Sequence, residues 1–411
     1  MRVLVISAAF PPMQAGEADH TLHLCQHLAA RGLDVHLLTT RIDLGARDLP
    51  FKIYPEIEDW SWRDLPRLAR RLKRCSPDVV LLFYIGWIYN DHPMVTFAPT
   101  VSKSLLPGAP FITQFANAIG AVPEQTSLAS RGIRKAVTTW AGKRGLDYRF
   151  GTLLRDSDRV IVLSDLHRAT LSELFPGVDH KAVLIPPPPI LFICPEDDGA
   201  ARSRGREALG LSDKDFLVAY LGYVYPRKGI ETLLKAVQAV SHERENIRLV
   251  VIGGTLQGFS SYAEAVYEMP DQMGIGDRVT WTGQYSWDSD KASTYLRAAD
   301  AFVLPIEIGV QMNNSSFAAA ATHGLPIITT RGSDLEPQFV HQENVYLCPP
   351  KDHEAMAEAI RLLMDAPDLR ARLGAGALKL AQDWFSWDGA IERTLATFGE
   401  GKMFDAHTGH I

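Results

Sequence analysis

The first half of the chain alternates short apolar runs with segments of helical periodicity. Apolar runs lie at residues 3–7, 33–39, 79–84, 111–115 and 159–164. Between the first two runs, apolar residues recur at helical spacing, at Ala18, Leu22, Cys25 and Ala29. Gly32 then stands where a helix would stop. Continuous apolar strands separated by helices are typical of a parallel sheet with both faces covered. The pattern therefore predicts a doubly wound α/β domain.

The same pattern starts afresh in the second half, with apolar runs at 216–221, 247–252, 301–305 and 325–329. A helix after the first of these runs is marked by Ile230, Leu233, Leu234 and Val237. Between the halves stand four consecutive prolines, 186–189, and a polar stretch, 195–206. Consecutive prolines favour a stiff, extended connector. We therefore expect two Rossmann-like domains, at 1–187 and 200–385.

Two such domains joined by a semi-rigid hinge are expected to face each other across a cleft. In open α/β sheets, ligands bind beyond the carboxyl ends of the strands. Each domain would therefore offer its strand-end loops to the cleft. The architecture suggests two ligands brought face to face.

Length, composition and charge exclude several classes of protein. A chain of 411 residues with 46% hydrophobic and 22% charged residues is typical of a globular protein of two domains. A net charge of -6 gives no general reason to expect nucleic-acid binding. No stretch approaches the about 20 apolar residues of a membrane span, and the four cysteines lack metal-ligand spacing. We expect a cytoplasmic protein without a metal or cofactor.

One basic segment, residues 131–149, surrounds Trp140 with cations. These are Arg131, Arg134, Lys135, Lys143, Arg144 and Arg149. The segment is either a solvated helical face or a patch that contacts anionic lipid or a lipid-linked acceptor, which would place the protein peripherally at the inner face of the membrane.

The turn at 222–229 carries Arg227 and Lys228 between an apolar run and a helix. Cations beside helix-terminal amides suit a diphosphate. The alternative is an ordinary turn with surface cations.

A second polar loop follows the apolar run at 301–305 and holds Gly309, Asn313 and Asn314. Ser315 or Ser316 can cap the alanine-rich helix that comes next, and Gly324 can end it. A capped helix N-terminus at the carboxyl end of a strand is an anion site. The alternative is a plain loop with good capping residues.

In the first domain, Gly16 would let a ligand approach the backbone closely. The aromatic segment 84–93 contains Tyr84, Trp87, Asn90 and His92, whose ring faces and polar tips would suit a sugar. A core edge with aromatic packing is the competing interpretation. His20, alone on a helix, is expected to be structural. No Walker motif, zinc-binding His pair, nucleophile elbow or strict GxGxxG is present.

Taken together, these residues resemble the retaining glycosyltransferases of family 4, which have the GT-B fold. The resemblance covers nearly the whole chain and depends on the order and spacing of short fragments. In the first half they are Phe10-Pro-Pro, Gly16, His20, Leu28, Arg31-Gly32, residues 158–164 and Ile185-Pro186. In the second half they are Leu221-Gly222, Lys228-Gly229, Ala299-Asp300, Leu304-Pro305 and residues 251–254, 279–283 and 323–330. Residues 385–388 resemble the point where these enzymes send their last helix, here about 388–411, back onto the first domain.

The resemblance implies roles for particular residues. Lys228 would contact the donor diphosphate, and Gly16 would lie against it from the opposite domain. The loop from Gly309 to Phe317 would wrap the donor phosphate and sugar with backbone amides. The donor base would be flanked by Gly283, Gln284 and Tyr285. His92 is matched to a first-domain histidine near the reacting sugar.

The sequence departs from the family pattern at three positions. Tyr223 stands where the family has arginine, for which Arg227 is a substitute. The family's paired glutamates align with Gln311 and Ala319, and Glu307 is the nearest acid.

We expect metal-independent transfer of a sugar, with retention, from a nucleotide diphosphate sugar to a glycan, glycolipid or small-molecule acceptor. Two alternatives stay open. One is a nucleotide-sugar epimerase of the same fold. The other is a non-catalytic nucleotide-sugar-binding protein, which Gln311 and Ala319 in place of the paired glutamates make plausible.

Overall fold

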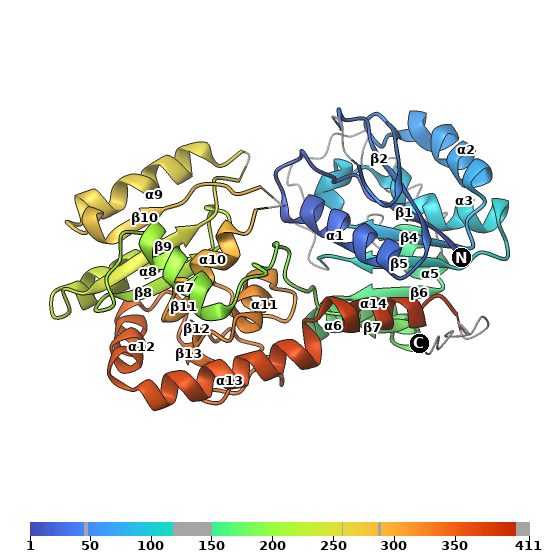
Figure 1. Cartoon of the computed structure of the whole chain (residues 1–411). Coiled ribbons are helices and arrows are strands. Elements are labelled where there is room, and N and C mark those ends of the chain that lie inside the picture. The colour runs from blue at the N-terminus through green and yellow to red at the C-terminus, as the bar shows by residue number, and fades with distance from the viewer. Residues whose placement is uncertain (45–47, 118–149, 257, 287–288, 400–411) are drawn as a thin grey trace, which may run out of the picture. The chain divides into compact units, whose positions relative to one another are not determined.

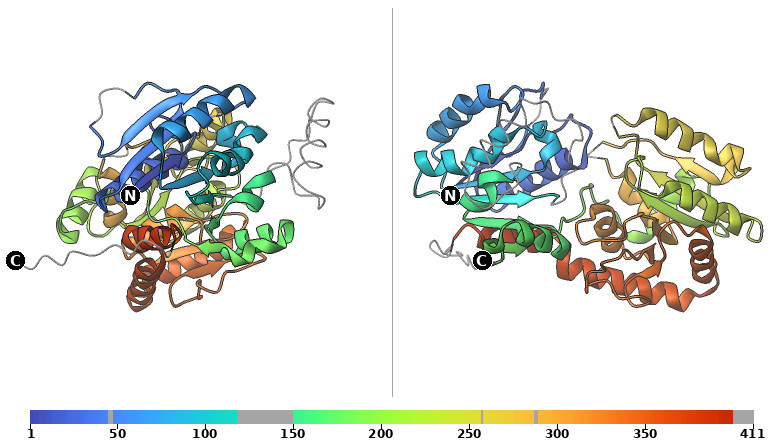
Figure 2. Two further views of the ribbon diagram at one scale, coloured as in Figure 1. Left: turned by 90° about the vertical axis from the view of Figure 1, so that its right-hand side faces the viewer. Right: turned by 180° about the vertical axis from the view of Figure 1, so that it is seen from behind.

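The computed structural model describes all residues except 45–47, 118–149, 257, 287–288 and 400–411. The basic segment at 131–149 therefore lies outside the described residues. The chain divides into two compact units. The first contains Met1–Met13, His20–Ile185 and Asp388–Ile411, and the second contains Gln14–Asp19 and Pro186–Trp387. Figures 1 and 2 show both units from three sides.

A seven-stranded sheet forms the first unit, in the order β3-β2-β1-β4-β5-β6-β7, and every neighbouring pair is parallel. The strands are β1 (Arg2–Ile6), β2 (Asp34–Thr40), β3 (Lys52–Ile57), β4 (Val79–Tyr84), β5 (Phe111–Phe115), β6 (Arg159–Val162) and β7 (Ala182–Leu184). All five apolar runs of the first half are strands. The sequence pattern did not show β3 and β7, because β3 is a half-exposed edge strand containing proline and β7 spans only three residues.

Helices cover both faces of this sheet. They are α1 (Gly16–Ala30), η1 (Trp62–Asp64), α2 (Leu65–Cys75), η2 (Gly86–Tyr89), η3 (Pro93–Phe97), α3 (Ala98–Leu105), α5 (Gly151–Asp156), α6 (Asp165–Leu174), η4 (Pro176–His180) and α14 (Trp387–Ala396). The chain moves from β1 to β2 in one direction and from β4 to β5 in the other. Because crossovers are right-handed, α1 and α3 lie on opposite faces. The last helix is tied to α1 by Arg31, which pairs with Asp388 at 2.7 Å.

A six-stranded parallel sheet forms the second unit, in the order β10-β9-β8-β11-β12-β13. Its strands are β8 (Phe216–Leu221), β9 (Ile247–Ile252), β10 (Val279–Trp281), β11 (Ala301–Leu304), β12 (Ile327–Thr330) and β13 (Tyr346–Cys348). The helices are α7 (Asp198–Ala208), α8 (Ile230–Ser241), α9 (Ser260–Gln272), η5 (Gly276–Arg278), α10 (Lys291–Ala298), α11 (Ser315–Thr322), α12 (His353–Asp365) and α13 (Pro367–Trp384). Every residue of β8 is buried, as a sheet covered on both faces requires. The expected doubly wound α/β architecture of both halves is confirmed.

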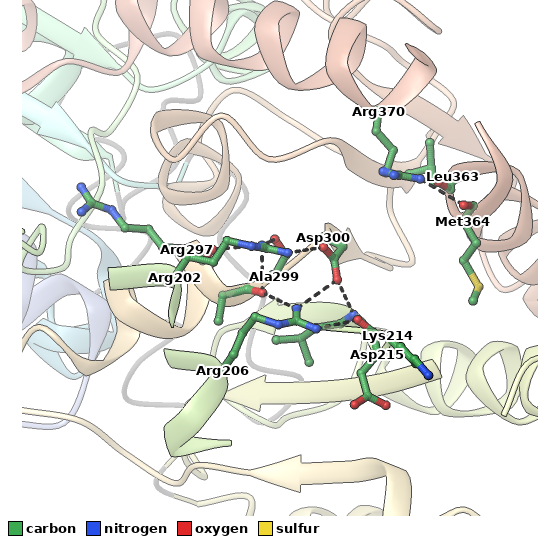
Figure 3. A network of polar contacts seen from close by, with 12 residues as sticks. Arg202, Arg206, Lys214, Asp215, Arg297, Ala299, Asp300, Leu363, Met364 and Arg370 are labelled. Atoms are coloured by element: carbon green, nitrogen blue, oxygen red, sulfur yellow. Dashed lines mark hydrogen bonds and ion pairs between the residues drawn. The ribbon is translucent and has the colours of Figure 1, made fainter. Parts of the chain in front are cut away.

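The polar stretch at 195–206 is not simply a connector, because most of it belongs to α7. Asp197 caps this helix by accepting the amide of Gly199 at 2.9 Å. Figure 3 shows how its arginines reach the sheet: Arg202 and Arg206 both contact the carboxylate of Asp300, which also accepts the amide of Leu217 at the start of β8. The helix carries few apolar residues, so its attachment through arginine left no hydrophobic period in the sequence.

The proline connector, residues 186–189, is buried and lies beside the first residue of α14. Nε1 of Trp387 donates a hydrogen bond to the carbonyl of Pro189 at 2.9 Å. Two of the four places where the chain passes between the units, after residue 185 and after residue 387, are therefore close together.

Candidate active site in the second unit

Two strand-end loops of the second unit leave the sheet side by side. From β8 the chain continues to β9 on one side, and from β11 it continues to β12 on the other, so the winding direction reverses between β8 and β11. Ligands of open α/β sheets bind at this reversal, beyond the carboxyl ends of the strands. The loops that start there are 222–229 and 305–314.

Glycines bring the backbones of these loops into contact. Gly229 has a φ of 76°, and a Cβ on it would lie 1.9 Å from the carbonyl oxygen of Pro305. A Cβ on Gly222 would lie 3.5 Å from Oγ of Ser316, in the first turn of α11. A side chain at Gly229 would force the loops apart, whereas at Gly222 the distance to Ser316 is an ordinary contact and the φ of 145° is what favours glycine. Gly229 therefore allows the lysine-bearing loop to pack against the end of β11, and Gly222 lies in contact range of the first turn of α11.

Arg227 and Lys228 lie in the first of these loops. Arg227 is exposed, and its carbonyl accepts the amide of Glu307 at 3.2 Å. Nζ of Lys228 lies 5.0 Å from the centre of the Tyr225 ring, a cation–π distance. Neither cation forms an ion pair with any carboxylate in the described part of the chain. Both charges are thus available to an anion at the strand ends.

The second loop is fixed by the segment that follows β12. The amide of Val310 donates to the carbonyl of Thr330 at 2.9 Å. The amide of Met312 donates to the buried carboxylate of Glu336 at 2.6 Å. Sequence reasoning missed Glu336, which stands alone in a polar segment and belongs to no periodic pattern. Its role depends on a contact across 24 positions of the chain, which only the fold reveals.

Asn314, and not Ser315 or Ser316, caps α11. Its backbone is extended, and its side-chain oxygen accepts the amide of Phe317 at 2.9 Å. The two serines are already the first residues of the helix, which corrects the expected cap. As first-turn residues, their amides have no acceptor within the helix. The helix ends at Thr322, and Gly324 follows with a φ of 64°, as expected.

The remaining residues of this candidate loop differ in their exposure. Asn313, Ser315 and Ser316 are half-buried. The ring of Phe317 is fully buried, with ring centres 5.1 Å from Phe339 and 6.0 Å from Phe385. Because its amide already donates to Asn314, Phe317 anchors α11 in the core.

The two glutamates of the family pattern are replaced in this chain, and the nearest acid, Glu307, is held in an ion pair. Gln311 is half-buried, and Ala319 lies fully buried within α11. The carboxylate of Glu307 forms an ion pair with Nζ of Lys351 at 3.0 Å. Glu307 thus lies in the switch-point loop, held by a lysine that follows β13.

Gly283, Gln284 and Tyr285 follow β10 and belong to the same edge of the sheet. Gly283 pairs with Gly253, which follows β9. A Cβ on Gly254 would lie 3.1 Å from Cβ of Gln284. The amide of Val224, after β8, donates to the carbonyl of Gly254 at 2.9 Å. The loops after β8, β9 and β10 are therefore joined by backbone contacts into one continuous rim.

The first unit has its own reversal of winding, between β1 and β4, and the aromatic segment lies after β4. Tyr84 is buried, with its ring 5.8 Å from Tyr89 and 5.6 Å from Phe115, so its side chain is part of the core edge. Trp87 is 44% exposed. Asn90 is exposed, and its side-chain amide donates to the carbonyl of Asp59 at 3.3 Å.

His92 caps the short 3-10 helix η3. Its Nδ1 accepts the amide of Met94 at 3.1 Å, and its ring centre lies 5.5 Å from that of Trp62. Burial lowers the pKa of His92. The hydrogen bond requires an unprotonated Nδ1, which leaves Nε2 to carry the proton of the neutral ring.

His20 and Gly16 lie at the start of α1. Nε2 of His20 is 3.0 Å from the side-chain amide of Gln114 on β5, and burial lowers the pKa of this histidine to about 4. The geometry fits the structural role that the sequence predicted. A Cβ on Gly16 would lie 3.3 Å from Cδ1 of Ile190, so this position needs a small residue for packing as well.

The described residues contain neither a cluster suited to a metal ion nor a helix suited to a membrane span. No group of three or more His, Cys, Asp or Glu side chains in these ranges is arranged to hold a metal ion. Among the described helices, none combines the length and the apolar character needed to cross a membrane.

Comparison with known proteins decides the family. The model of Glycosyltransferase Family 4 matches residues 16–188, and that of Glycosyl transferases group 1 matches residues 202–380. A D-inositol 3-phosphate glycosyltransferase of Xylanimonas cellulosilytica is 30% identical, over 97% of this chain and 96% of its own length. The chain is a family 4 glycosyltransferase. The relative of the same name from Segniliparus rotundus is 28% identical over 60% of this glycosyltransferase, a match that spans about half (53%) of the relative's own length.

Solved structures share the fold of this glycosyltransferase. Sucrose-phosphate synthase from Thermosynechococcus elongatus matches with a TM-score of 0.69 and 19% identity, over 96% of this chain and 98% of that one. HepE from Anabaena, solved with UDP and glucose, matches with a TM-score of 0.69 and 14% identity, over 97% and 100%. The expected GT-B fold, with two Rossmann-like domains, is confirmed.

Proposed function

We propose that this glycosyltransferase moves a sugar from a nucleotide diphosphate sugar to a glycan, glycolipid or small-molecule acceptor, with retention at the anomeric carbon. The observation that carries the proposal is the contact between the loop of Lys228 and the N-terminus of α11 at the switch point of the second sheet. An anion bound there would meet a lysine and free helix amides together. HepE, which shares the fold, was solved with UDP and glucose.

The leaving nucleoside diphosphate would receive its stabilisation from the chain. Lys228 supplies a positive charge, and the first-turn amides of Ser315 and Ser316 supply donors at the positive end of the helix dipole. Arg227 stands beside Lys228 in place of the arginine that the family has at Tyr223. These groups are positioned before the reaction by backbone contacts, and preorganised donors of this kind lower the barrier where charge develops. We therefore propose a metal-independent reaction.

Retention is proposed to occur on one face of the sugar, with the leaving phosphate assisting the acceptor. Glu307 is the single acid of loop 305–314, and its ion pair with Lys351 reduces its availability as a nucleophile. The rim formed by Gly283, Gln284 and Tyr285 would flank the nucleobase. His92 lies in the first unit and would act through Nε2, because its Nδ1 accepts the amide of Met94.

The experiment that tests the donor site is a thermal-shift panel of UDP, GDP, ADP and dTDP, each with and without EDTA. A ligand that binds the folded chain raises its melting temperature by mass action. We expect one selective shift that survives EDTA. Lys228→Ala should weaken the binding of that nucleotide about 10- to 100-fold, the loss expected for a hydrogen bond to a charged group. Exposed Lys235 on α8 provides the control, and Lys235→Ala should leave the shift unchanged.

Once the panel has identified the nucleobase of the donor, turnover of the matching nucleotide sugars is followed by NMR. A first-formed product with the donor's anomeric configuration supports retention, and the inverted configuration contradicts it. If no nucleotide shifts the protein at millimolar concentration, the donor-site proposal fails. If a nucleotide binds but no acceptor in a sugar and lipid panel turns over, a binding protein describes the chain better. Conversion of the nucleotide sugar into its epimer without an acceptor would identify an epimerase.

A further inference from the structure

Two loops of the first unit meet at the carboxyl-end edge of its sheet: residues 58–64, which follow β3, and residues 85–92, which follow β4. In the strand order, β2 and β1 separate these two strands. Nε1 of Trp60, in the first loop, donates to Oγ1 of Thr40 at the end of β2 at 2.8 Å. The ring of Trp60 packs edge-on against that of Tyr89, in the second loop, with centres 4.8 Å apart. Because the winding reverses between β1 and β4, the two loops lie where sheets of this kind bind ligands.

The first loop is held by one buried carboxylate. Asp64 is fully buried and accepts three consecutive amides, those of Glu58, Asp59 and Trp60, at 3.2, 3.0 and 3.0 Å. Arg67, on α2, pairs with the same carboxylate at 2.5 Å. Trp60 itself has a φ of 58°, which is rare for a bulky residue. Strained backbone that the surrounding structure fixes in this way is concentrated at functional sites.

The second loop is tied to the first by contacts of its own. Asn90 and Asp91 both have left-handed backbones, with φ of 55° and 50°. The side-chain amide of Asn90 donates to the carbonyl of Asp59 at 3.3 Å. The ring centre of His92 lies 5.5 Å from that of Trp62. Non-glycine residues in the left-handed region thus stand on both loops, as in binding surfaces that are held in a fixed shape.

We name the surface of these two loops the β3–β4 ledge: Asp59, Trp62, Asn90 and His92. Trp62 is 39% exposed, and its ring is held by His92 and by Phe97, whose ring centre lies 5.4 Å away. The carboxylate of Asp59 and the side-chain oxygen of Asn90 can each accept hydrogen bonds. Nε2 of His92 carries the proton of the neutral ring, because Nδ1 already accepts a backbone amide. The ledge therefore combines an aromatic ring with hydrogen-bond acceptors and a donor.

The β3–β4 ledge has no excess of positive charge. Hydrogen bonds from Ser61 and the nearby charge of Arg63 lower the pKa of Asp59, so its carboxylate is ionised at neutral pH. The charge of Arg63 offsets that of the carboxylate. Two further arginines of this region, Arg41 and Arg67, already form ion pairs with carboxylates of loop 58–64. A phosphate bound on the ledge would therefore meet a carboxylate without a pair of unpaired cations to compensate it.

We propose that the β3–β4 ledge binds one neutral sugar ring of the acceptor, with a C–H face on Trp62 and hydroxyl groups on Asp59 and Asn90. A pyranose has an apolar face and a rim of hydroxyls, and an indole beside hydrogen-bond acceptors matches both. A hydroxyl donates to a carboxylate, whereas a phosphate is repelled by it. The acceptor is therefore a neutral glycan or glycoside, and not a phosphorylated sugar or polyol. This inference rests on the proposed glycosyl transfer, whose acceptor it narrows to one chemical class.

The test is saturation-transfer-difference NMR of the full chain without a donor. The neutral probes are the methyl glycosides of glucose, galactose, mannose and N-acetylglucosamine, and the anionic probes are glucose 6-phosphate and inositol 3-phosphate. We expect at least one neutral glycoside to bind at millimolar concentration. Its ring C–H protons should receive the strongest saturation, because they would lie on the indole. A phosphate probe that binds should lose its signal in Lys228→Ala, and not in variants of the ledge, because it would occupy the donor phosphate site.

Trp62→Ala should weaken binding of the glycoside about tenfold, and Trp62→Phe should retain most of it. Asp59→Asn should weaken it about tenfold or more, the loss expected for a hydrogen bond to a charged group. The matched controls lie in the second unit: Phe192→Ala, at a ring that is 44% exposed, and Asp277→Asn, at an exposed carboxylate. Both controls should bind the glycoside as the wild type does. Thermal unfolding establishes that every variant is folded.

Turnover connects the β3–β4 ledge with the reaction. With the nucleotide sugar identified, a glycoside that binds the ledge should also accept the sugar. Trp62→Ala should then raise the KM for this glycoside about tenfold and leave the nucleotide shift unchanged. If the bound glycoside is never glycosylated while the enzyme turns over another acceptor, the proposal is wrong.

The proposal is also overturned if no neutral glycoside binds, if Trp62→Ala binds like the wild type, or if a phosphate probe binds instead and loses affinity in Trp62→Ala. Loss of glycoside binding in Lys228→Ala would likewise overturn it, because the glycoside would then occupy the donor site. Its failure is distinguishable from that of the proposed function. Absence of glycoside binding with an intact nucleotide shift contradicts only the ledge, whereas absence of any nucleotide shift contradicts the donor site.

Discussion

Gly229 illustrates how one missing side chain shapes the candidate site. It has a φ of 76°, it precedes the first residue of α8, and its Cα lies against the carbonyl of Pro305. A carbonyl in the backbone of a buried strand end cannot move as a flexible side chain could. The residue therefore combines an unusual backbone conformation with a steric requirement, and both arise from the approach of the two switch-point loops.

Gly229→Ala should lower the free energy of unfolding of the second unit by about 3 kcal/mol or more, because strain and a backbone clash add together. Gly210 is the matched control: its φ is 66°, but a Cβ there meets nothing within 4 Å. Gly210→Ala should therefore cost about 1 kcal/mol, the strain alone. Urea unfolding of both variants measures the difference. Equal costs would show that the loops separate easily, contrary to the geometry.

Other residues of the site differ in whether their role could be recognised from the sequence. Arg227 and Lys228 were identified from a basic turn between a strand and a helix, and the structure places them at the switch point. Glu336 carried no such signal, although it fixes the loop that leads into α11. Chemistry that is local to a turn can be recognised in a sequence, whereas a hydrogen bond between distant loops cannot.

At the scale of elements, the N-terminus of α11 is the part most directly linked to the proposed function. Asn314 fixes where the helix begins, and thereby where its first free amides point. The second unit contains a comparable cap at α12, where Asp352 accepts the amide of Ala355 at 2.9 Å. The two caps have the same local chemistry, but only the cap of α11 lies at the proposed phosphate site. Removing each cap in turn therefore distinguishes an effect on nucleotide binding from an effect on stability.

Asn314→Ala and Asp352→Ala should each cost about 1 kcal/mol of stability, the usual loss of a capping side chain. Only Asn314→Ala should also weaken binding of the selected nucleotide, because only this cap orients the amides of the proposed phosphate site. Urea unfolding and nucleotide titration measure the two effects. A nucleotide affinity that falls equally in both variants would mean that α11 is not the phosphate site.

For the whole molecule, buried histidines make the first unit sensitive to acid. Burial lowers the pKa of His20, His23 and His167 to about 4, well below the about 6.5 of an unfolded chain. As the pH falls from 7, the unfolded state therefore takes up protons before the folded state does. The stability these neutral histidines contribute is complete above pH 6.5 and is lost progressively toward pH 4.

His167→Gln removes one of the three histidines that take up a proton when the chain unfolds. Between pH 7 and pH 5, the free energy of unfolding should fall by about 2 kcal/mol less in the variant than in the wild type. Denaturant unfolding at the two pH values, followed by signals from the first unit, provides the measurement. An unchanged pH dependence would show that His167 titrates normally and is not held in its neutral form.

The sequence by itself determined the architecture and the chemical class of this glycosyltransferase. Strands covered on both faces must be apolar throughout, so β4 and β8 were visible as continuous runs, and turns rich in glycine and cations marked the ends of strands. These signals lie within a few neighbouring residues. The family resemblance used the same signals in their order along the chain.

The tertiary structure alone decided which of these turns meet. Gly229 touches Pro305, Gly253 pairs with Gly283, and Met312 donates to Glu336, although long stretches of chain separate each pair. It also decided that Asn314 caps α11 and that α7 is a helix held by arginines. Each of these facts depends on how close two backbones come when the sheet is wound. A sequence does not display that distance, because packing of the whole domain determines it.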